Sequence, residues 1–154
     1  MFDVLLYLFE NYFCDDPHAN RDRDSLQAAV IQAGFKPSEV AKAFQWLDDA
    51  ATRRSGFDHS AAPSDSVRVY SEKEIERLDA EGRGFLMFLC HNGVLDRQQH
   101  ECVIDRAMAL EIDCIDLDDL RWVVLLVLIS QPDQEAAYAW MESYLFDDEA
   151  QCLH

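Results

Sequence analysis

The sequence has no long hydrophobic run and no sign of an export signal. Its longest uninterrupted apolar stretch, Trp122 to Ile129, has eight residues, whereas a helix needs about 18 to 20 to cross a bilayer. The N-terminal segment carries Asp3 where a secretory signal carries basic residues, and Glu10 interrupts the apolar stretch that follows. We therefore expect no membrane contact and a cytoplasmic location.

Glycine and proline are also scarce, and the number of cysteines is odd. The 154 residues include 5 Gly and 4 Pro, and 49% of them are hydrophobic, which is typical of a globular rather than a disordered chain. A chain of this length can bury a core without disulfides or a structural metal. The five cysteines, an odd number at irregular spacings, indicate reduced thiols.

Basic charge is scarcest in the second half of the chain. There are 13 Lys and Arg against 30 Asp and Glu, a net charge of -17. Residues 84–154 hold three basic and fourteen acidic residues, a net charge of -11, whereas residues 21–83 hold ten and twelve, a net charge of -2. The C-terminal half therefore repels phosphate backbones and favours basic partners. Nucleic acid, if it binds, is expected at residues 21–83.

Apolar residues recur at helical spacing, with capping residues and glycines between the repeats. Ser71 with Glu74, and Asp96 with Gln99, have the spacing of capping boxes. Gly34 is placed to end a helix in a left-handed backbone conformation. The pattern predicts about seven helices: from Phe2 to Phe13, from Leu26 to Gly34, from Ser38 to Arg54, from Ser71 to Gly93, from Asp96 to Met108, from Asp116 to about Pro132, and from Asp133 to Leu145.

Some of these helices carry more specific expectations. Ser38 is expected to cap the third helix. Gly82 and Gly84 weaken the fourth and predict a kink or a close helix crossing. The sixth is apolar on every side from Trp122 to Ile129, which predicts a position at the centre of its bundle. Val67 to Tyr70 is the one strand-like stretch.

The expected fold is all-α, a compact multi-helix bundle of about seven helices. It contains an N-terminal helix-turn-helix-like pair and at most one short strand-like segment. Residues 1–54 are expected to form an N-terminal helical subdomain, residues 55–70 a flexible loop with a short extended segment, and residues 71–154 an acidic C-terminal bundle.

Leu26 to Ala51 has the helix, glycine-containing turn and helix of a DNA-binding helix-turn-helix. The second helix, however, offers Glu39, Asp48 and Asp49 beside Lys42, so its surface is net negative where phosphate contacts require Arg and Lys. Because helix pairs with short turns are common in helical proteins, a structural role is the favoured interpretation. If nucleic acid does bind, the expected contacts are Arg21, Arg23, Lys36, Lys42, Arg53, Arg54 and Arg68.

No complete catalytic or metal motif is present. His100 begins a segment like the zinc-protease motif, but Ile104 stands where the second histidine is required. Four residues could in principle bind zinc, namely Cys90, His91, His100 and Cys102. Their spacing matches no familiar pattern, so core thiols and surface imidazoles are the favoured interpretation. We expect no cofactor and no catalytic residue.

Arg83 lies between two glycines, Gly82 and Gly84. It could bind an anion at a helix kink. Glycines that permit close packing, with Arg83 paired to a neighbouring acid, are the favoured alternative.

Several segments, spread in order along the whole chain, match a known family. They are Met1–Glu10, Glu76–Asp79, Arg83–Leu86, Val103–Arg106, Leu117–Val123 and Leu153–His154. On these segments the chain resembles the bacterial Smg family. The family has no established activity, so the resemblance implies a bacterial cytosolic protein without implying a reaction, and no functional residues carry over.

The favoured functional hypothesis is a non-enzymatic cytosolic interaction or adaptor protein, whose partner has a basic surface. The alternative is a nucleic-acid-associated regulatory or DNA-processing accessory module that uses residues 21–83. An enzyme with a cryptic site is the least favoured hypothesis. The sequence gives no indication of oligomeric state.

Overall fold

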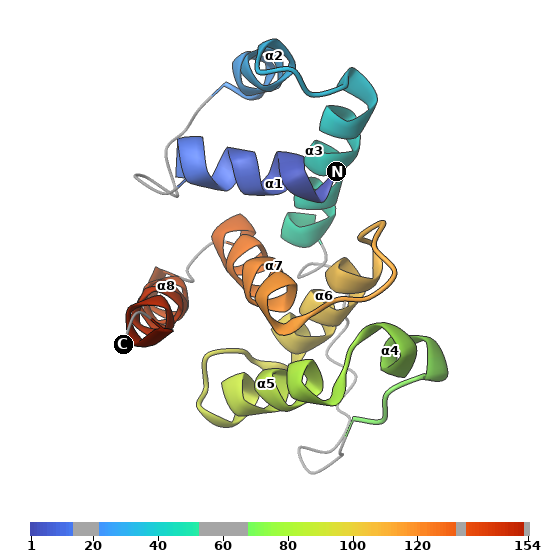
Figure 1. The fold of residues 1–154 in the computed structure, drawn as a ribbon, viewed down its shortest axis with the longest axis vertical. Coiled ribbons are helices and arrows are strands. Elements are labelled where there is room, and N and C mark those ends of the chain that lie inside the picture. The colour runs from blue at the N-terminus through green and yellow to red at the C-terminus, as the bar shows by residue number, and fades with distance from the viewer. Residues whose placement is uncertain (14–21, 53–67, 132–134, 153–154) are drawn as a thin grey trace.

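A computed structural model of the chain describes residues 1–13, 22–52, 68–131 and 135–152 (Figure 1). Every regular element within these ranges is helical, which confirms the all-α prediction. Helix α1 continues directly into a π-helical turn, η1. The elements are α1 (Phe2–Leu8), η1 (Phe9–Phe13), α2 (Arg23–Gln32), α3 (Pro37–Thr52), α4 (Glu72–Arg77), α5 (Ala80–His91), α6 (Arg97–Met108), α7 (Leu117–Ser130) and α8 (Glu135–Cys152).

Helix ends follow the capping residues that the sequence predicts. Both capping boxes form, Ser71 with Glu74 at the start of α4 and Asp96 with Gln99 at the start of α6. Gly34 has a φ of 109°, a conformation that favours glycine, so the predicted stop after α2 is confirmed. These short-range side-chain contacts satisfy backbone groups that a helix end leaves without partners.

The predicted helix from Ser71 to Gly93 is wrong in one respect, because it is two helices. Leu78 between them is extended, with φ -103° and ψ 114°, and fully buried. It forms an isolated parallel bridge with Ile115. The side chain of Asp79 then starts α5 by accepting a hydrogen bond from the N–H of Gly82 at 2.7 Å. The break therefore lies before the glycines, at a residue held by a distant segment.

The start of α3 also differs from the prediction. The helix begins at Pro37, so Ser38 lies inside its first turn and does not cap it. Proline is well suited to the first helical position because its fixed φ fits the helix and its missing N–H would have no partner there. Of the predicted strand-like stretch, residues 68–70 belong to no strand, and Val67 lies outside the described residues.

Helix α7 occupies the centre of the molecule, as its apolar sequence predicts. Figure 1 shows α7 between α1 and α3 on one side and α5 and α6 on the other, with α8 beside it. Its residues from Val123 to Leu128 are at most 1% exposed. Within the described parts of the chain, no helix is both long enough and apolar enough to cross a membrane.

The N-terminal and C-terminal helices share one hydrophobic core. Helix α3 packs on α6 and α7 as well as on α1 and α2. The ring of Phe9 in η1 lies edge-on to that of Trp122 in α7, with their centroids 5.0 Å apart. The boundary at residues 55–70 stays a prediction, since most of that segment lies outside the described residues.

Candidate functional site

The end of α5 and the loop after it separate two hollows on the surface. One hollow, of about 500 Å³, is lined by Tyr70, Cys90, His91 and His100, and we call it the Tyr70 pocket. The other, also about 500 Å³, extends to Trp140 of α8 and is called the Trp140 pocket. Leu95 and Asp96 line both hollows, which therefore adjoin each other.

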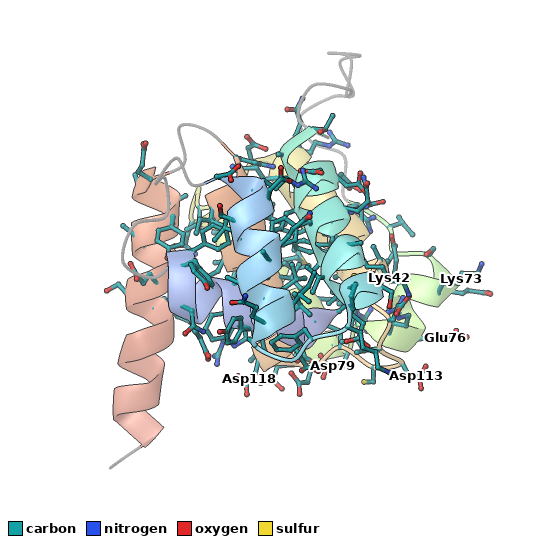
Figure 2. All side chains as sticks on the ribbon, turned by 90° about the horizontal axis from the view of Figure 1, so that it is seen from above. Lys42, Lys73, Glu76, Asp79, Asp113 and Asp118 are labelled. Atoms are coloured by element: carbon teal, nitrogen blue, oxygen red, sulfur yellow. The ribbon has the colours of Figure 1, made fainter. Side chains whose placement is uncertain are left out.

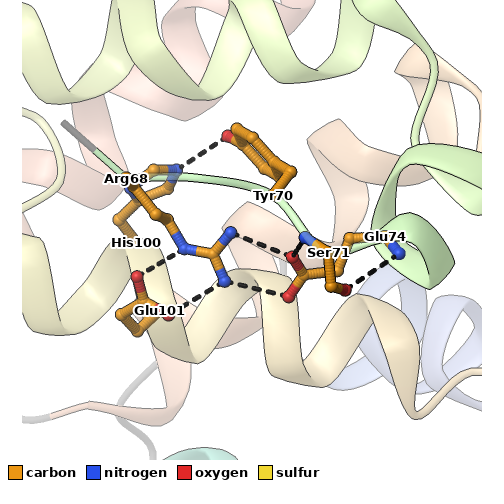
Figure 3. Close-up of polar contacts among 6 residues, drawn as sticks. All are labelled: Arg68, Tyr70, Ser71, Glu74, His100 and Glu101. Atoms are coloured by element: carbon orange, nitrogen blue, oxygen red, sulfur yellow. Dashed lines mark hydrogen bonds and ion pairs between the residues drawn. The ribbon is translucent and has the colours of Figure 1, made fainter.

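Arg68 forms one wall of the Tyr70 pocket and ties α4 to α6 (Figure 3). Its guanidinium donates to Glu74 at 2.9 and 3.1 Å and to Glu101 through Nε and Nη2. The hydrogen bond from Arg68 lowers the pKa of Glu74 to about 2, and the bond with Glu74 raises the pKa of Arg68 above its ordinary value. Because two carboxylates hold this cation, it is not free to recruit an anionic ligand.

Tyr70, Cys90 and His100 of the Tyr70 pocket are partly or fully buried, which disfavours their charged forms. The Tyr70 hydroxyl and His100 Nε2 are hydrogen-bonded at 3.3 Å (Figure 3). Burial lowers the pKa of His100 and raises the pKa of Tyr70 and of the Cys90 thiol. A cysteine nucleophile must be a thiolate, so a Cys90 kept as a thiol is poorly suited to covalent chemistry.

An exposed aromatic cluster adjoins the Trp140 pocket, where α5 meets α8. The rings of Trp140 and Tyr144 are stacked, with centroids 5.3 Å apart and planes 6° from parallel. Phe88 of α5 lies 6.1 Å from Trp140. The exposed fractions are 59% for Met87, 43% for Phe88 and 38% for Trp140. Contiguous exposed apolar side chains make this surface a candidate for contact with another molecule.

Sequence reasoning identified neither hollow and did not single out the exposed Met87 and Phe88. A usable signal was present, because residues 85 to 90 are six consecutive apolar residues, FLMFLC. A helix with one buried face must expose some members of such a run. Which members are exposed depends on where α8 lies.

Comparison with known proteins places the chain in a family. The family model described as "Protein of unknown function (DUF494)" matches residues 1–154. Proteins named "Protein Smg homolog" from Stenotrophomonas maltophilia (strain K279a) and Xanthomonas campestris pv. campestris (strain B100) are 56% and 54% identical to it. Each alignment covers 99% of this chain and 96% of the relative. The chain belongs to the Smg (DUF494) family. No solved structure matches it.

In this Smg-family chain, three of the predicted nucleic-acid contacts are engaged by carboxylates. Arg23 pairs with Asp48 at 2.6 Å, and Lys42 with Glu111 at 2.5 Å, while Arg68 is held as described above. Lys36 is exposed. The remaining three, Arg21, Arg53 and Arg54, lie outside the described residues. Helix α3, the recognition helix of the hypothesis, packs against four other helices and keeps an exposed face that includes Lys42 and Gln45.

Arg83 of this Smg-family chain lies against the ring of Tyr70. Its guanidinium lies over the Tyr70 ring, 5.8 Å from the centroid, and its Nε donates to the backbone carbonyl of Asp79 at 3.3 Å. Of the two neighbouring glycines, Gly82 does pack closely: a Cβ there would lie 3.2 Å from Leu120 Cδ2. The predicted close approach of helices is therefore confirmed at Gly82.

The four residues considered for zinc do not all meet. Cys90, His91 and His100 line the Tyr70 pocket, whereas Cys102 is buried on the other side of α6, with its Sγ 3.8 Å from the carbonyl of Ala50 in α3. Among the described residues, no three His, Cys, Asp or Glu side chains are arranged to hold a metal ion.

Proposed function

We propose that this protein is a non-enzymatic cytoplasmic interaction protein, and that its partner is a protein with a basic surface. The observation that carries the proposal is the exposed cluster of Met87, Phe88 and Trp140 in the half of the chain with a net charge of -11. An apolar centre within an acidic surface favours a partner with apolar contacts and surrounding Lys and Arg.

The chemistry of the Tyr70 pocket supports recognition over catalysis. Burial raises the pKa of the Cys90 thiol and lowers the pKa of His100, and Arg68 is neutralised by Glu74 and Glu101. A general acid or base works best when its pKa lies near the working pH, and these groups are shifted away from it. An adaptor needs none of them to titrate.

Crosslinking and affinity purification from the native bacterium test the proposal. The tagged full-length chain is crosslinked in living cells and purified at low and at high salt. We expect a specific protein partner that is recovered without nuclease sensitivity and is lost at high salt when the crosslinker is omitted. Recovery of the chain alone under gentle, low-salt conditions contradicts the proposal.

The second candidate is a nucleic-acid-associated module that uses residues 21–83. The observation in its favour is the α2–α3 pair, which is joined by a turn at Gly34 with a φ of 109°. Purification with and without nuclease separates the two candidates, because a partner held through nucleic acid is lost after nuclease treatment. Fluorescence anisotropy with labelled duplex DNA at low salt provides a direct check, and steep salt dependence is expected if phosphates are bound.

A further inference from the structure

Gly84 has no packing partner in the described chain. It lies in the interior of α5, and a Cβ added there would meet no atom within 4 Å. Glycine destabilises a helix interior relative to alanine, because it loses more conformational freedom on folding. Gly82 has a compensating contact with Leu120, whereas Gly84 has none. Packing within the described fold therefore gives no reason for a glycine at this position.

Gly84 belongs to an exposed helical face, which we call the α5 outer face. The face consists of Ala80, Gly84, Met87, Phe88 and His91, all exposed. Their spacing from Gly84, four residues before it and three, four and seven after it, places them on one side of a helix. Small residues at Ala80 and Gly84 leave the backbone accessible at one end of this face, and Met87 and Phe88 supply apolar contacts at the other.

The Tyr70 pocket and the aromatic side chains of α8 lie beside the α5 outer face, next to different residues of it. Met87 and His91 also line the Tyr70 pocket. Phe88 contacts Trp140 and Tyr144, with ring centroids 6.1 and 6.2 Å apart. A helix that lies along α5 over Gly84 can therefore place side chains toward the Tyr70 pocket on one side and toward Trp140 on the other. Methionine adds to this versatility, because its flexible thioether adapts to different partners.

The charges around the α5 outer face indicate which kind of helix could bind there. Glu81 in the first turn of α5 is exposed, Asp96 lines both pockets, and Glu101 lines the Tyr70 pocket. Of the nearby cations, Arg68 is already paired with Glu74 and Glu101, and Arg121 beside Tyr144 is paired with Asp118. Arg83 lies over Tyr70, and Arg97 lines the Tyr70 pocket next to Asp96. A second copy of this chain would bring a further net charge of -17 to the contact. A cationic partner is favoured instead.

We infer that the α5 outer face is the docking site for an amphipathic helix of the partner, with apolar residues toward Met87 and Phe88 and Lys or Arg along its edges. This inference rests on the proposed function and specifies its surface. The mode is helix-in-groove recognition, in which the apolar stripe of a helix enters a groove. Gly84 lets the two helix axes approach closely, because the side chains at a contact set the distance between axes.

A bulky residue at Gly84 tests the inference without touching the core. Gly84→Leu places a side chain into open space, so we expect the variant to fold and to melt no lower than wild type. The control is Ala28→Leu, the same kind of enlargement at an exposed position of α2, which lies at the opposite end of the molecule from α5 (Figure 1). Circular dichroism melting verifies both proteins.

The probe is a fluorescein-labelled synthetic helix of about 18 residues, five turns long, with leucines on one face and lysines on the other. Anisotropy titration of the full-length chain should give a saturable 1:1 complex. We expect Gly84→Leu and Met87→Glu to weaken this complex by roughly tenfold or more, and Ala28→Leu to leave it within about twofold.

Three results overturn the inference. One is equal binding by Gly84→Leu and wild type, which means that lysines bind the acidic surface at large. Another is a wild-type dimer in light scattering that Gly84→Leu converts to a monomer, which makes a second copy the occupant. The third is recovery of the cellular partner by Gly84→Leu as efficiently as by wild type. In that last case the proposed function stands and only this surface is wrong, whereas absence of any partner for wild type contradicts the function itself.

Discussion

The indole Nε1–H of Trp46 in α3 donates a 2.9 Å hydrogen bond to the backbone carbonyl of Arg106 in α6. Both residues are nearly completely buried, at 2% and 4% exposed. The Arg106 side chain extends the link, because it pairs with Asp49 of α3 at 3.1 Å and with Asp105 at 2.6 Å. The helices before and after residues 53–67 are thereby joined by hydrogen bonds as well as by apolar packing.

Replacing Trp46 should therefore destabilise the whole fold. Trp46→Phe leaves the Arg106 carbonyl without its indole donor and removes buried ring volume, at a cost of about 1 to 3 kcal/mol in the free energy of unfolding. Urea denaturation followed by circular dichroism measures this. The matched control is Trp140→Phe at a residue that is 38% exposed, where we expect less than about 1 kcal/mol. Equal losses for the two variants would refute the role given to Trp46.

The Arg68–Glu74 pair predicts a loss of stability in acid. The pKa of Glu74 is about 2 in the folded chain against its ordinary value of 4.5. Its contribution is therefore fully present above pH 4.5 and is lost as the pH falls from 4.5 toward 2. Glu74→Gln removes the charge but keeps a side chain able to complete the capping box. We expect melting curves of Glu74→Gln to depend less on pH across this window than those of wild type.

The control for the Glu74 experiment is Glu72→Gln, which removes an acid in the same first turn of α4. It should leave the acid dependence close to that of wild type. If Glu74→Gln and wild type lose stability in parallel between pH 4.5 and 2, the ion pair with Arg68 does not supply the effect.

The buried His100 predicts a second dependence of the fold's stability on pH. Burial lowers its pKa below the ordinary value of 6.5, so the unfolded chain binds a proton more readily than the folded chain. Stability is then fully present above pH 6.5 and declines as the pH falls below it. His100→Gln cannot titrate and should flatten this part of the profile. Titration of the His100 ring by NMR provides the direct measurement, and a pKa at or above 6.5 would contradict the assignment.

Replacing Gly84 by alanine and replacing Gly34 by alanine should change the stability of the fold in opposite directions. Gly84→Ala meets no atom within 4 Å, so the gain in helix propensity should stabilise the fold by about 0.5 to 1 kcal/mol and raise the melting temperature by about 1 to 4 °C. Gly34→Ala forces an L side chain into a φ of 109° and should destabilise it by about 1 to 2 kcal/mol. Differential scanning calorimetry on both variants checks the signs.

The sequence allowed accurate prediction wherever a contact joins near neighbours. The Ser71 and Asp96 capping boxes each involve residues three apart, so their spacing alone identifies them. The buried position of α7 also follows from its composition, since a helix apolar on every side cannot face water.

The sequence-based predictions failed where contacts between distant parts of the chain determine the backbone conformation or the exposure of a residue. Leu78 fits the apolar stripe of a continuous helix, and only its bridge to Ile115 accounts for the extended backbone. Arg68 was considered as a nucleic-acid contact, yet its partner Glu101 lies 33 residues away. Likewise Met87 and Phe88 belong to a run of apolar residues whose exposed members could not be identified until α5 and α8 were placed together.

Figure 2 shows charged side chains on the periphery of the molecule, including Lys42, Glu76 and Asp118, around the helices that enclose α7. Helix α7 is synthesised after most of the helices that enclose it, so their apolar surfaces lack its packing during part of translation. Helix α3 ends at Thr52 and α7 begins at Leu117, so about 65 residues, or roughly 3 to 13 s of translation, separate them. During this interval Phe9 is synthesised without Trp122 of α7, the ring against which it packs, so the apolar face of the N-terminal helices stays uncovered until α7 follows.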